Sequence, residues 1–284
     1  MKNILLPTDF SKTSLHAIEY AVQLFKEEDC TFYVLNTYEP VALYSATAYG
    51  MDPALNMDIG EIFKTTSEKR VQKIIDKVAS KYPDTKHIFQ GVSSFNMLNA
   101  EVEELVEDYA IDLIIMGTNG ASGLKEVFIG SQTMHVIKDA KIPVIGVPAG
   151  YSYKKPKDIL FTTDFKTDTN QKGLALLEEL CSKNSSRLIF LNIFQGVRLT
   201  EQQVKNQQAL EAHFKRDAPI TQIVKGVEVL DAMEEFQSKH SIELLVLVHN
   251  KHNFFENLLF TPVVQKIVHY SDVPFLILPH YKTE

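Results

Sequence analysis

The chain has 284 residues, which is too long for one ordinary domain and suits two domains of about 140 residues each. Its formal net charge of −7 and pI of about 5.7 argue against a nucleic-acid partner, because contacts to phosphates need a basic face. The first residues contain no apolar signal stretch, and no run approaches the roughly 18 apolar residues of a membrane span. Two cysteines, Cys30 and Cys181, are too few for a disulfide framework, so we expect a cytoplasmic protein with no membrane partner.

Short apolar runs alternate with amphipathic segments through the first half of the chain. Leu15, Ile18, Val22 and Phe25 recur at helical spacing, and Ser11 is a suitable N-cap for that helix. Strands are expected at 3–6, 31–37, 86–90, 111–116 and 142–147, and helices at 11–26, 60–82, 96–109 and 131–139. Strands that alternate with helices predict a parallel sheet that is covered by helices on both faces.

The second half of the chain repeats the first half in order. KNILLPTDF at 2–10 returns as KDILFTTDF at 157–165, and KIPVIGVP at 141–148 returns as DVPFLILP at 272–279. Between them, YVLNTY at 33–38 returns as IFLNIF at 189–194. We therefore expect two tandem α/β domains, residues 1–149 and 155–284, each a five-stranded, mostly parallel sheet flanked by helices. Residues 149–157 have the polar, Gly- and Pro-containing composition of a linker.

Glycines gather directly after the fourth expected strand, in MGTNGASGLKEVFIGSQT at 116–133. In a doubly wound sheet, ligands bind beyond the carboxyl ends of the strands, where the winding reverses. If the first strand neighbours the fourth, PTD at 7–9 faces the glycine stretch there. Glycines allow the backbone to approach a phosphate closely, and a helix that begins near Ser131 offers free N–H groups. The stretch therefore predicts a phosphate-binding loop.

The glycine spacing matches neither a P-loop nor G-x-G-x-x-G. Gly117, two residues, Gly120, nine residues, Gly130 and Ser131 instead resemble the G-2x-G-9x-G-[S/T] nucleotide-binding motif of the universal stress protein family. ILLPTDFS, DLIIMG and IPVIGVP resemble the framework of that family, and the resemblance covers essentially the whole chain.

The resemblance implies two tandem Rossmann-like domains of the adenine nucleotide alpha hydrolase-like type. It implies ATP or AMP as the ligand of the first domain. Magnesium commonly accompanies ATP and would be held through the nucleotide phosphates. The nucleotide-binding residues that it implies are Pro7, Thr8, Asp9, Thr37, Met116, Gly117, Gly120, Gly130, Ser131, Gln132 and Thr133. Two plainer alternatives stay open: the glycines form only a turn, and Asp9 only caps the first helix.

The second half does not keep the glycine pattern. At a constant offset from the first half, the residues that replace Gly117, Gly120, Gly130 and Ser131 are Val248, Lys251, Thr261 and Pro262. We expect the second domain not to bind ATP in this manner and to serve a structural role. The resemblance also implies that 142–148 pairs with 273–279 in an intramolecular pseudo-dimer, and it leaves room for a homodimer of chains.

No catalytic residues and no set of metal ligands stand out. The first domain lacks a Walker lysine, an obvious base and an arginine finger, so we expect a stress-response sensor or regulator that at most hydrolyses ATP weakly. The alternatives are a slow ATPase and a nucleotide-independent module that binds an unidentified protein partner. The apolar, irregular segment 39–60, with Tyr44, Tyr49, Met51 and Met57, is either a lid or docking surface, or a segment packed on the other domain.

Overall fold

The computed structural model describes residues 1–38, 53–83, 86–118, 131–166, 172–194, 196, 198–215, 219–225, 229–249 and 273–279. Strands and helices alternate through these residues, as predicted. In chain order they are β1 (Lys2–Pro7), α1 (Lys12–Leu24), β2 (Cys30–Thr37), α3 (Pro53–Lys81), β3 (His87–Ser94), α4 (Leu98–Asp108), β4 (Leu113–Gly117), α5 (Ser131–Asp139), β5 (Val144–Val147), β6 (Asp158–Thr162), α6 (Lys172–Asn184), β7 (Arg187–Phe194), α7 (Glu201–His213), β8 (Ile220–Lys225), α8 (Val229–Lys239), β9 (Leu244–His249) and β10 (Phe275–Pro279).

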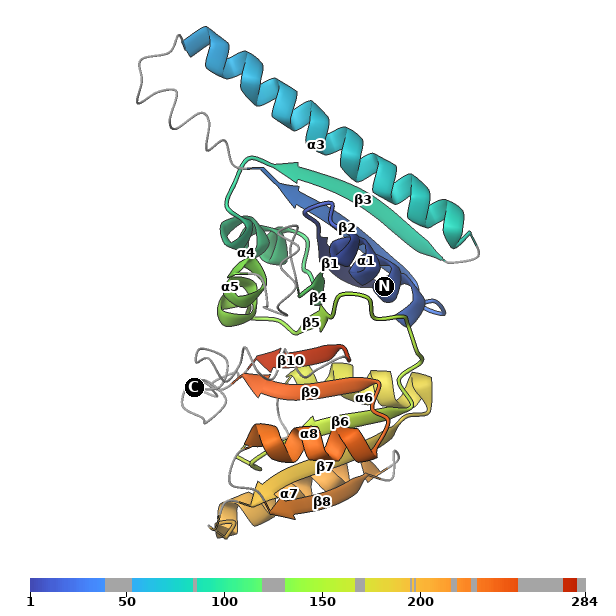
Figure 1. The fold of residues 1–284 in the computed structure, drawn as a ribbon, viewed down its shortest axis with the longest axis vertical. Coiled ribbons are helices and arrows are strands. Elements are labelled where there is room, and N and C mark those ends of the chain that lie inside the picture. Colours follow the sequence, from blue (N-terminus) through green and yellow to red (C-terminus); the bar gives the residue numbers. More distant parts are fainter. Residues whose placement is uncertain are drawn as a thin grey trace.

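The described strands form one ten-stranded sheet in the order β3-β2-β1-β4-β5-β10-β9-β6-β7-β8 (Figure 1). The order of the first five strands returns in reverse in the second five, which agrees with the repeat in the sequence. Neighbouring strands are parallel within each half, so the expected mostly parallel α/β fold is confirmed. The halves meet where β5 and β10 pair antiparallel, with Ile145 opposite Leu276.

Two hydrophobic cores lie on the two faces of this sheet. Alternate residues of a strand point to opposite faces, so Ile4 and Leu6 enter one core and Leu5 enters the other. The first core contains side chains of α1, α3, α6 and α7, and the second contains side chains of α4, α5 and α8. Each core continues from one half into the other. The helices on the two faces place the ends of β1 and β4 at the point where the winding changes face.

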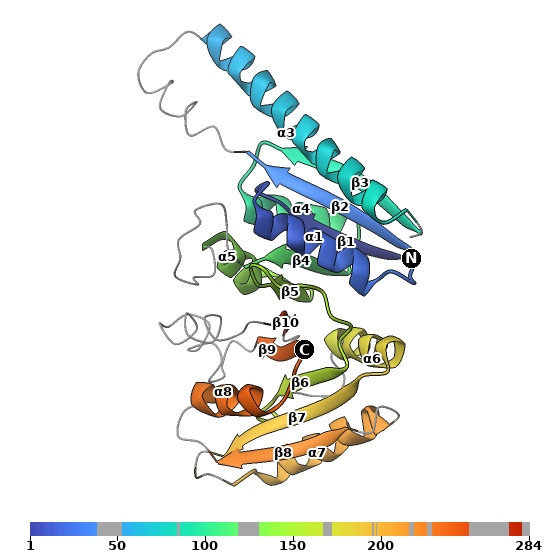
Figure 2. The ribbon, with the colours of Figure 1, turned by 45° about the vertical axis from the view of Figure 1, so that its right-hand side comes forward.

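The long helix α3 begins earlier than expected. Residues 53–60 are helical, so the prediction of an irregular segment through 60 is wrong there, and residues 39–52 lie outside the described residues. A glycine such as Gly60 is tolerated inside a helix, and Pro53 suits the first helical position. The helix lies along β3 and extends past the end of the sheet (Figures 1 and 2). Despite its 29 residues, neither α3 nor another described helix combines the length and apolar composition needed to cross a bilayer.

The connection between the halves is anchored by aromatic side chains. The rings of Tyr151 and Tyr153 lie 6.1 and 5.6 Å from the buried ring of Tyr20 on α1, both edge-on. Gly150 adopts a left-handed conformation with φ of 76° as the third residue of the turn that the Tyr151 N–H closes on the Pro148 carbonyl. Tyr151 and Tyr153 are therefore packed against the first half, whereas Lys157 bonds to Glu243 and Asn184 of the second half, although the composition of 149–157 is that of a linker.

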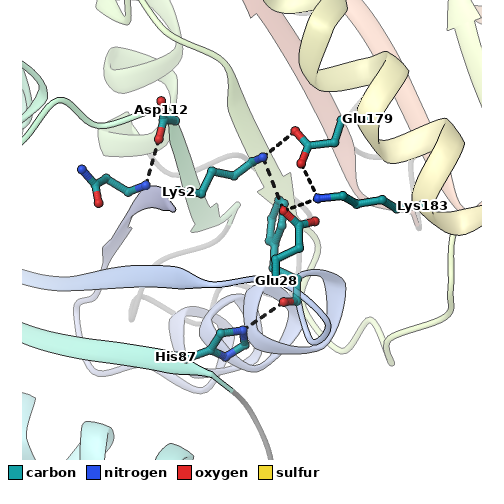
Figure 3. A network of polar contacts seen from close by, with 8 residues as sticks. Lys2, Glu28, His87, Asp112, Glu179 and Lys183 are labelled. Carbon is teal, nitrogen blue, oxygen red and sulfur yellow. Dashed lines mark hydrogen bonds and ion pairs between the residues drawn. The ribbon is translucent and has the colours of Figure 1, made fainter.

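An ion-pair network also joins the halves (Figure 3). Glu28, which follows α1, lies 3.5 Å from the Lys2 ammonium and 2.7 Å from the Lys183 ammonium. Glu179 on α6 pairs with the same two lysines, so positive and negative charges alternate around the group. Both first-half members are mostly buried, with 16% and 13% of the Lys2 and Glu28 side chains exposed, which limits screening by solvent.

Candidate functional site

Three strands that carry candidate residues end side by side. β1 lies between β2 and β4, with Pro7 opposite Leu35 and Leu5 opposite Ile114. The predicted neighbourhood of the first and fourth strands is therefore confirmed. Because parallel strands present their carboxyl ends at one edge, the residues after β1, Thr37 at the end of β2, and Gly117 at the end of β4 gather there.

A tight turn connects β1 to α1. The Thr8 hydroxyl accepts the Phe10 N–H at 3.0 Å, and the Asp9 carboxylate accepts the Ser11 N–H at 3.0 Å. These bonds hold Phe10 at a φ of 65°, a left-handed conformation that costs a non-glycine residue about 1 kcal/mol. Ser11 then caps α1 by accepting the Ser14 N–H at 3.1 Å, as predicted. Pro7 and Thr8 are buried, whereas Asp9 is exposed at the edge.

A series of hydrogen-bonded polar side chains holds this turn in place. The Asn36 amide donates to the Thr8 carbonyl at 2.7 Å, and its oxygen accepts the Ser67 hydroxyl of α3 at 2.8 Å. Ser67 also lies 2.9 Å from the Ser93 hydroxyl. Sequence reasoning assigned no role to these side chains. The signal that was available is the asparagine at the same place in both repeats, Asn36 and Asn192.

Helix α3 contacts the turn at a second point. The guanidinium of Arg70 lies 3.9 Å from the centre of the Phe10 ring, a cation–π contact. Beside it, at the end of β2, the ring of Tyr38 lies 5.8 Å from that of Phe95. Burial and the nearby carboxylates of Glu68 and Glu61 raise the pKa of Tyr38, so its phenol stays neutral at ordinary pH.

At the end of β4, the structure gives Gly117 a packing role. A Cβ at this position would lie 2.8 Å from Cγ2 of Thr13 and 3.0 Å from its carbonyl carbon, so the first turn of α1 leaves no room for a side chain. The Thr133 hydroxyl donates to the Gly117 carbonyl at 3.0 Å and ties the start of α5 to the end of β4. Met116 and Thr133 are buried, and Gln132 is exposed.

The remaining candidates are outside what the structure describes. Gly120 and Gly130 lie outside the described residues, and Ser131 is described only as the first residue of α5. Tyr44, Tyr49 and Met51 of the expected lid lie outside as well, and Met57 is placed on α3 without a described side chain.

The second half builds the same turn with different neighbours. The Thr163 hydroxyl accepts the Phe165 N–H at 2.9 Å, and Phe165 has a φ of 58°. Here, however, the Lys166 ammonium lies 3.2 Å from the Asp164 carboxylate, and Gln203 of α7 donates to the Asp164 carbonyl at 2.7 Å. The turn is therefore a feature of the fold, and the two halves differ in what surrounds the aspartate.

The strand register also confirms which residue of the second half corresponds to Gly117. Gly117 lies opposite Val147 on the last strand of its half, and Val248 lies opposite Leu278 on the last strand of the other. Val248 is buried, at 7% exposed. The end of β9 thus carries a side chain where the end of β4 has none.

Comparison with known proteins identifies the family. The sequence profile of the universal stress protein family matches residues 1–148. A universal stress protein of Methanocaldococcus jannaschii is 32% identical over 158 residues, which cover 55% of this chain and 84% of the relative. A second universal stress protein of the same organism is 28% identical over 154 residues, covering 51% of this chain and 94% of the relative.

Both halves of the fold occur together in a solved structure. The crystal structure of a universal stress protein from Archaeoglobus fulgidus superposes with a TM-score of 0.68 and 17% identity, covering 99% of this chain and 97% of that one. At this identity the similarity concerns the fold alone. The match of the family profile to more than half of the chain nevertheless settles its membership: the protein belongs to the universal stress protein family.

Proposed function

We propose that the first half binds an adenine nucleotide, ATP or AMP, at the edge where β1, β2 and β4 end, and that the protein acts as a stress-response sensor or regulator. The observation that carries the proposal is that β4, which leads into the motif Gly117-x2-Gly120-x9-Gly130-Ser131, lies directly beside β1. A nucleotide at that edge would reach both the glycine stretch and the turn at Thr8 and Asp9.

The described residues fit such a ligand in their chemistry. The bond from Thr133 to Gly117 holds the beginning of α5, with its free N–H groups and positive dipole end, next to the end of β4. The exposed carboxylate of Asp9 suits the hydroxyls of a ribose, and the exposed amide of Gln132 suits a phosphate oxygen. Magnesium would be held through the phosphates.

For the second half we propose a structural role without nucleotide binding. Its edge presents Val248 in place of Gly117. We also propose domain boundaries at 1–149 and 155–284, with the antiparallel β5 and β10 pair making an intramolecular pseudo-dimer. We propose a cytoplasmic location for the protein as well.

Calorimetric titration of the full chain with Mg-ATP and with AMP tests the proposal. We expect one site per chain, and Asp9→Asn should weaken binding about tenfold or more, because a charged acceptor toward the ribose is lost. Asn keeps an acceptor for the Ser11 N–H, so the turn is preserved. The matched control is Asp164→Asn, the same change in the same turn of the second half, which should leave binding unchanged.

Gly130→Val should abolish binding by blocking the approach of backbone to phosphate. Gly117→Val is unsuitable for this purpose, because it would displace Thr13 and destabilise the fold. Absence of binding to either nucleotide would refute the proposal and leave an interaction module as the function. ATP turnover that Gly130→Val removes would establish the slow ATPase.

A further inference from the structure

An exposed phenylalanine lies at the edge of the sheet where the nucleotide is proposed to bind. Phe95 directly follows β3, and 50% of its side chain is exposed. Its ring lies 5.8 Å from the ring of Tyr38, the residue after β2, at an angle of 58°, so Tyr38 supports one side of it. The Tyr38 N–H donates to the Ser94 carbonyl at 2.9 Å and ties the two strand ends together. Phe95 therefore presents an aromatic surface at the carboxyl edge of the sheet.

A buried carboxylate holds the loop that carries Phe95. Glu101 on α4 is only 8% exposed, and one of its oxygens accepts the Ser94 hydroxyl at 2.6 Å and the Asn96 amide at 3.1 Å. These two residues flank Phe95 in the chain, and Asn96 also accepts the Met97 N–H at 2.8 Å. The loop is thus fixed on both sides of the ring, which lowers the entropy that is lost when a ligand packs against it.

The second half has neither the ring nor the carboxylate at the corresponding positions. α4 and α8 have the same length, and the same interval separates them from β4 and β9. When the two helices are aligned residue by residue, the residues that correspond to Phe95 and Glu101 are Gly226 and Ala232. The exposed ring and its support therefore belong to the half that carries the glycine motif. This distribution favours a role in ligand binding over a role in the fold, which both halves share.

We propose that Phe95 stacks on the base of the nucleotide and so selects nucleotides over sugar phosphates that lack a base; this inference rests on the proposed binding of an adenine nucleotide. β4, β1, β2 and β3 lie side by side in this order, about 4.8 Å apart. With the phosphates at the glycine stretch after β4 and the ribose at Asp9 after β1, a base that continues in this direction reaches the ends of β2 and β3. Every base offers a flat π face, which suits an exposed aromatic ring.

Fluorescence gives a direct test, because the chain contains no tryptophan. Phe95→Trp places a single indole at this position, and a base that stacks on it should quench its emission. We expect AMP and Mg-ATP to quench the emission saturably, and ribose 5-phosphate, which lacks the base, not to quench it. The matched control is Tyr109→Trp. Tyr109 is a similarly exposed aromatic residue, at 41%, whose ring lies 4.8 Å from that of Tyr33, but it precedes β4 and so lies toward the other edge of the sheet. The emission of this control should not respond to either nucleotide.

Affinities measured by calorimetry separate the base contact from the rest of the site. Phe95→Ala should weaken the binding of AMP and Mg-ATP about tenfold, as expected for a lost base–aromatic stack, and should leave the binding of ribose 5-phosphate unchanged. Phe95→Tyr keeps a ring and should bind the nucleotides as the native chain does. Absence of quenching, unchanged nucleotide affinity in Phe95→Ala, or equal weakening of ribose 5-phosphate would overturn this inference and leave the proposed function standing. A native chain that binds neither nucleotide would overturn both.

Discussion

The junction between the halves can be tested by adding one methyl group. Gly146 on β5 lies directly opposite Phe275 on β10, and the ring of Phe275 covers the position of the missing side chain. A Cβ at residue 146 would lie 2.6 Å from Cε2 and 2.9 Å from Cε1 of the ring, and closer still to Cζ. Phe275 is 3% exposed, so the ring has little freedom to move away.

The sign of the Gly146→Ala effect distinguishes this contact from ordinary strand chemistry. In a strand without a close neighbour, alanine is more stable than glycine by roughly 0.5–1 kcal/mol. Overpacking in a buried contact costs about 1–3 kcal/mol, so Gly146→Ala should destabilise the protein by about 1–2 kcal/mol net. Phe275→Leu removes the ring atoms that clash, at a cost of about 1–2 kcal/mol of its own.

Urea unfolding of the full chain measures these differences. The double variant Gly146→Ala/Phe275→Leu should be about as stable as Phe275→Leu alone, a coupling of about 1–2 kcal/mol in favour of the pair. Gly60→Ala is the control, because a Cβ there has no atom within 4 Å, and this substitution in α3 should be neutral or stabilising. Strict additivity of the two junction changes would refute the reasoning.

Three further predictions concern buried polar groups. Burial opposes the charge of Glu179, yet hydrogen bonds from Lys183 and Lys2 hold its pKa at about 2, below its unfolded value of about 4.3. Its stabilisation is therefore present above about pH 4.3 and is lost as the pH falls toward 2, and Glu179→Gln should flatten this part of the dependence of Tm on pH. Asn36→Ala should lower stability by about 1–3 kcal/mol, because the buried Thr8 carbonyl loses its amide donor and Ser67 keeps only its bond to Ser93, and an unchanged urea midpoint would contradict this. Burial raises the pKa of Cys30 to about 12, so iodoacetamide at pH 8 should label it only after unfolding, as peptide mapping can show.

Much of the fold could be predicted because its signals are local and occur twice. The apolar runs, the Ser11 cap and the repeat identified the strands, α1 and the equivalence of the halves. The start of α3 was missed although Leu55, Ile59, Ile62 and Phe63 recur at helical spacing, because residues 53–59 continue the apolar composition of the segment before them. The third strand was likewise expected to stop at 90, but β3 continues to Ser94 because its whole length pairs with β2.

The candidate site was predictable in outline and not in detail. The sequence shows that a glycine follows β4, but it does not show that Thr13, far away in the chain, excludes a side chain at Gly117. The left-handed Phe10 depends on bonds from Thr8 and Asp9, and a Thr-Asp pair before a helix is only a weak turn signal. The hydrogen bonds of Ser67 join residues of β2, α3 and β3. The spacing of apolar residues in the sequence does not predict such contacts between distant elements.

The antiparallel pairing of β5 with β10 decides which strand edges of the chain remain available for contact with other chains. A single domain of this kind would leave its last strand open to any partner with a matching strand, including copies of other relatives. In this chain the last strand of each half pairs with the last strand of the other half. Because both strands belong to one polypeptide, this pairing does not depend on the concentration of the protein. Among the described strands, further copies can extend the sheet only through β3 and β8, the strands at its two ends. Duplication has thus converted a contact that would depend on protein abundance into one that does not.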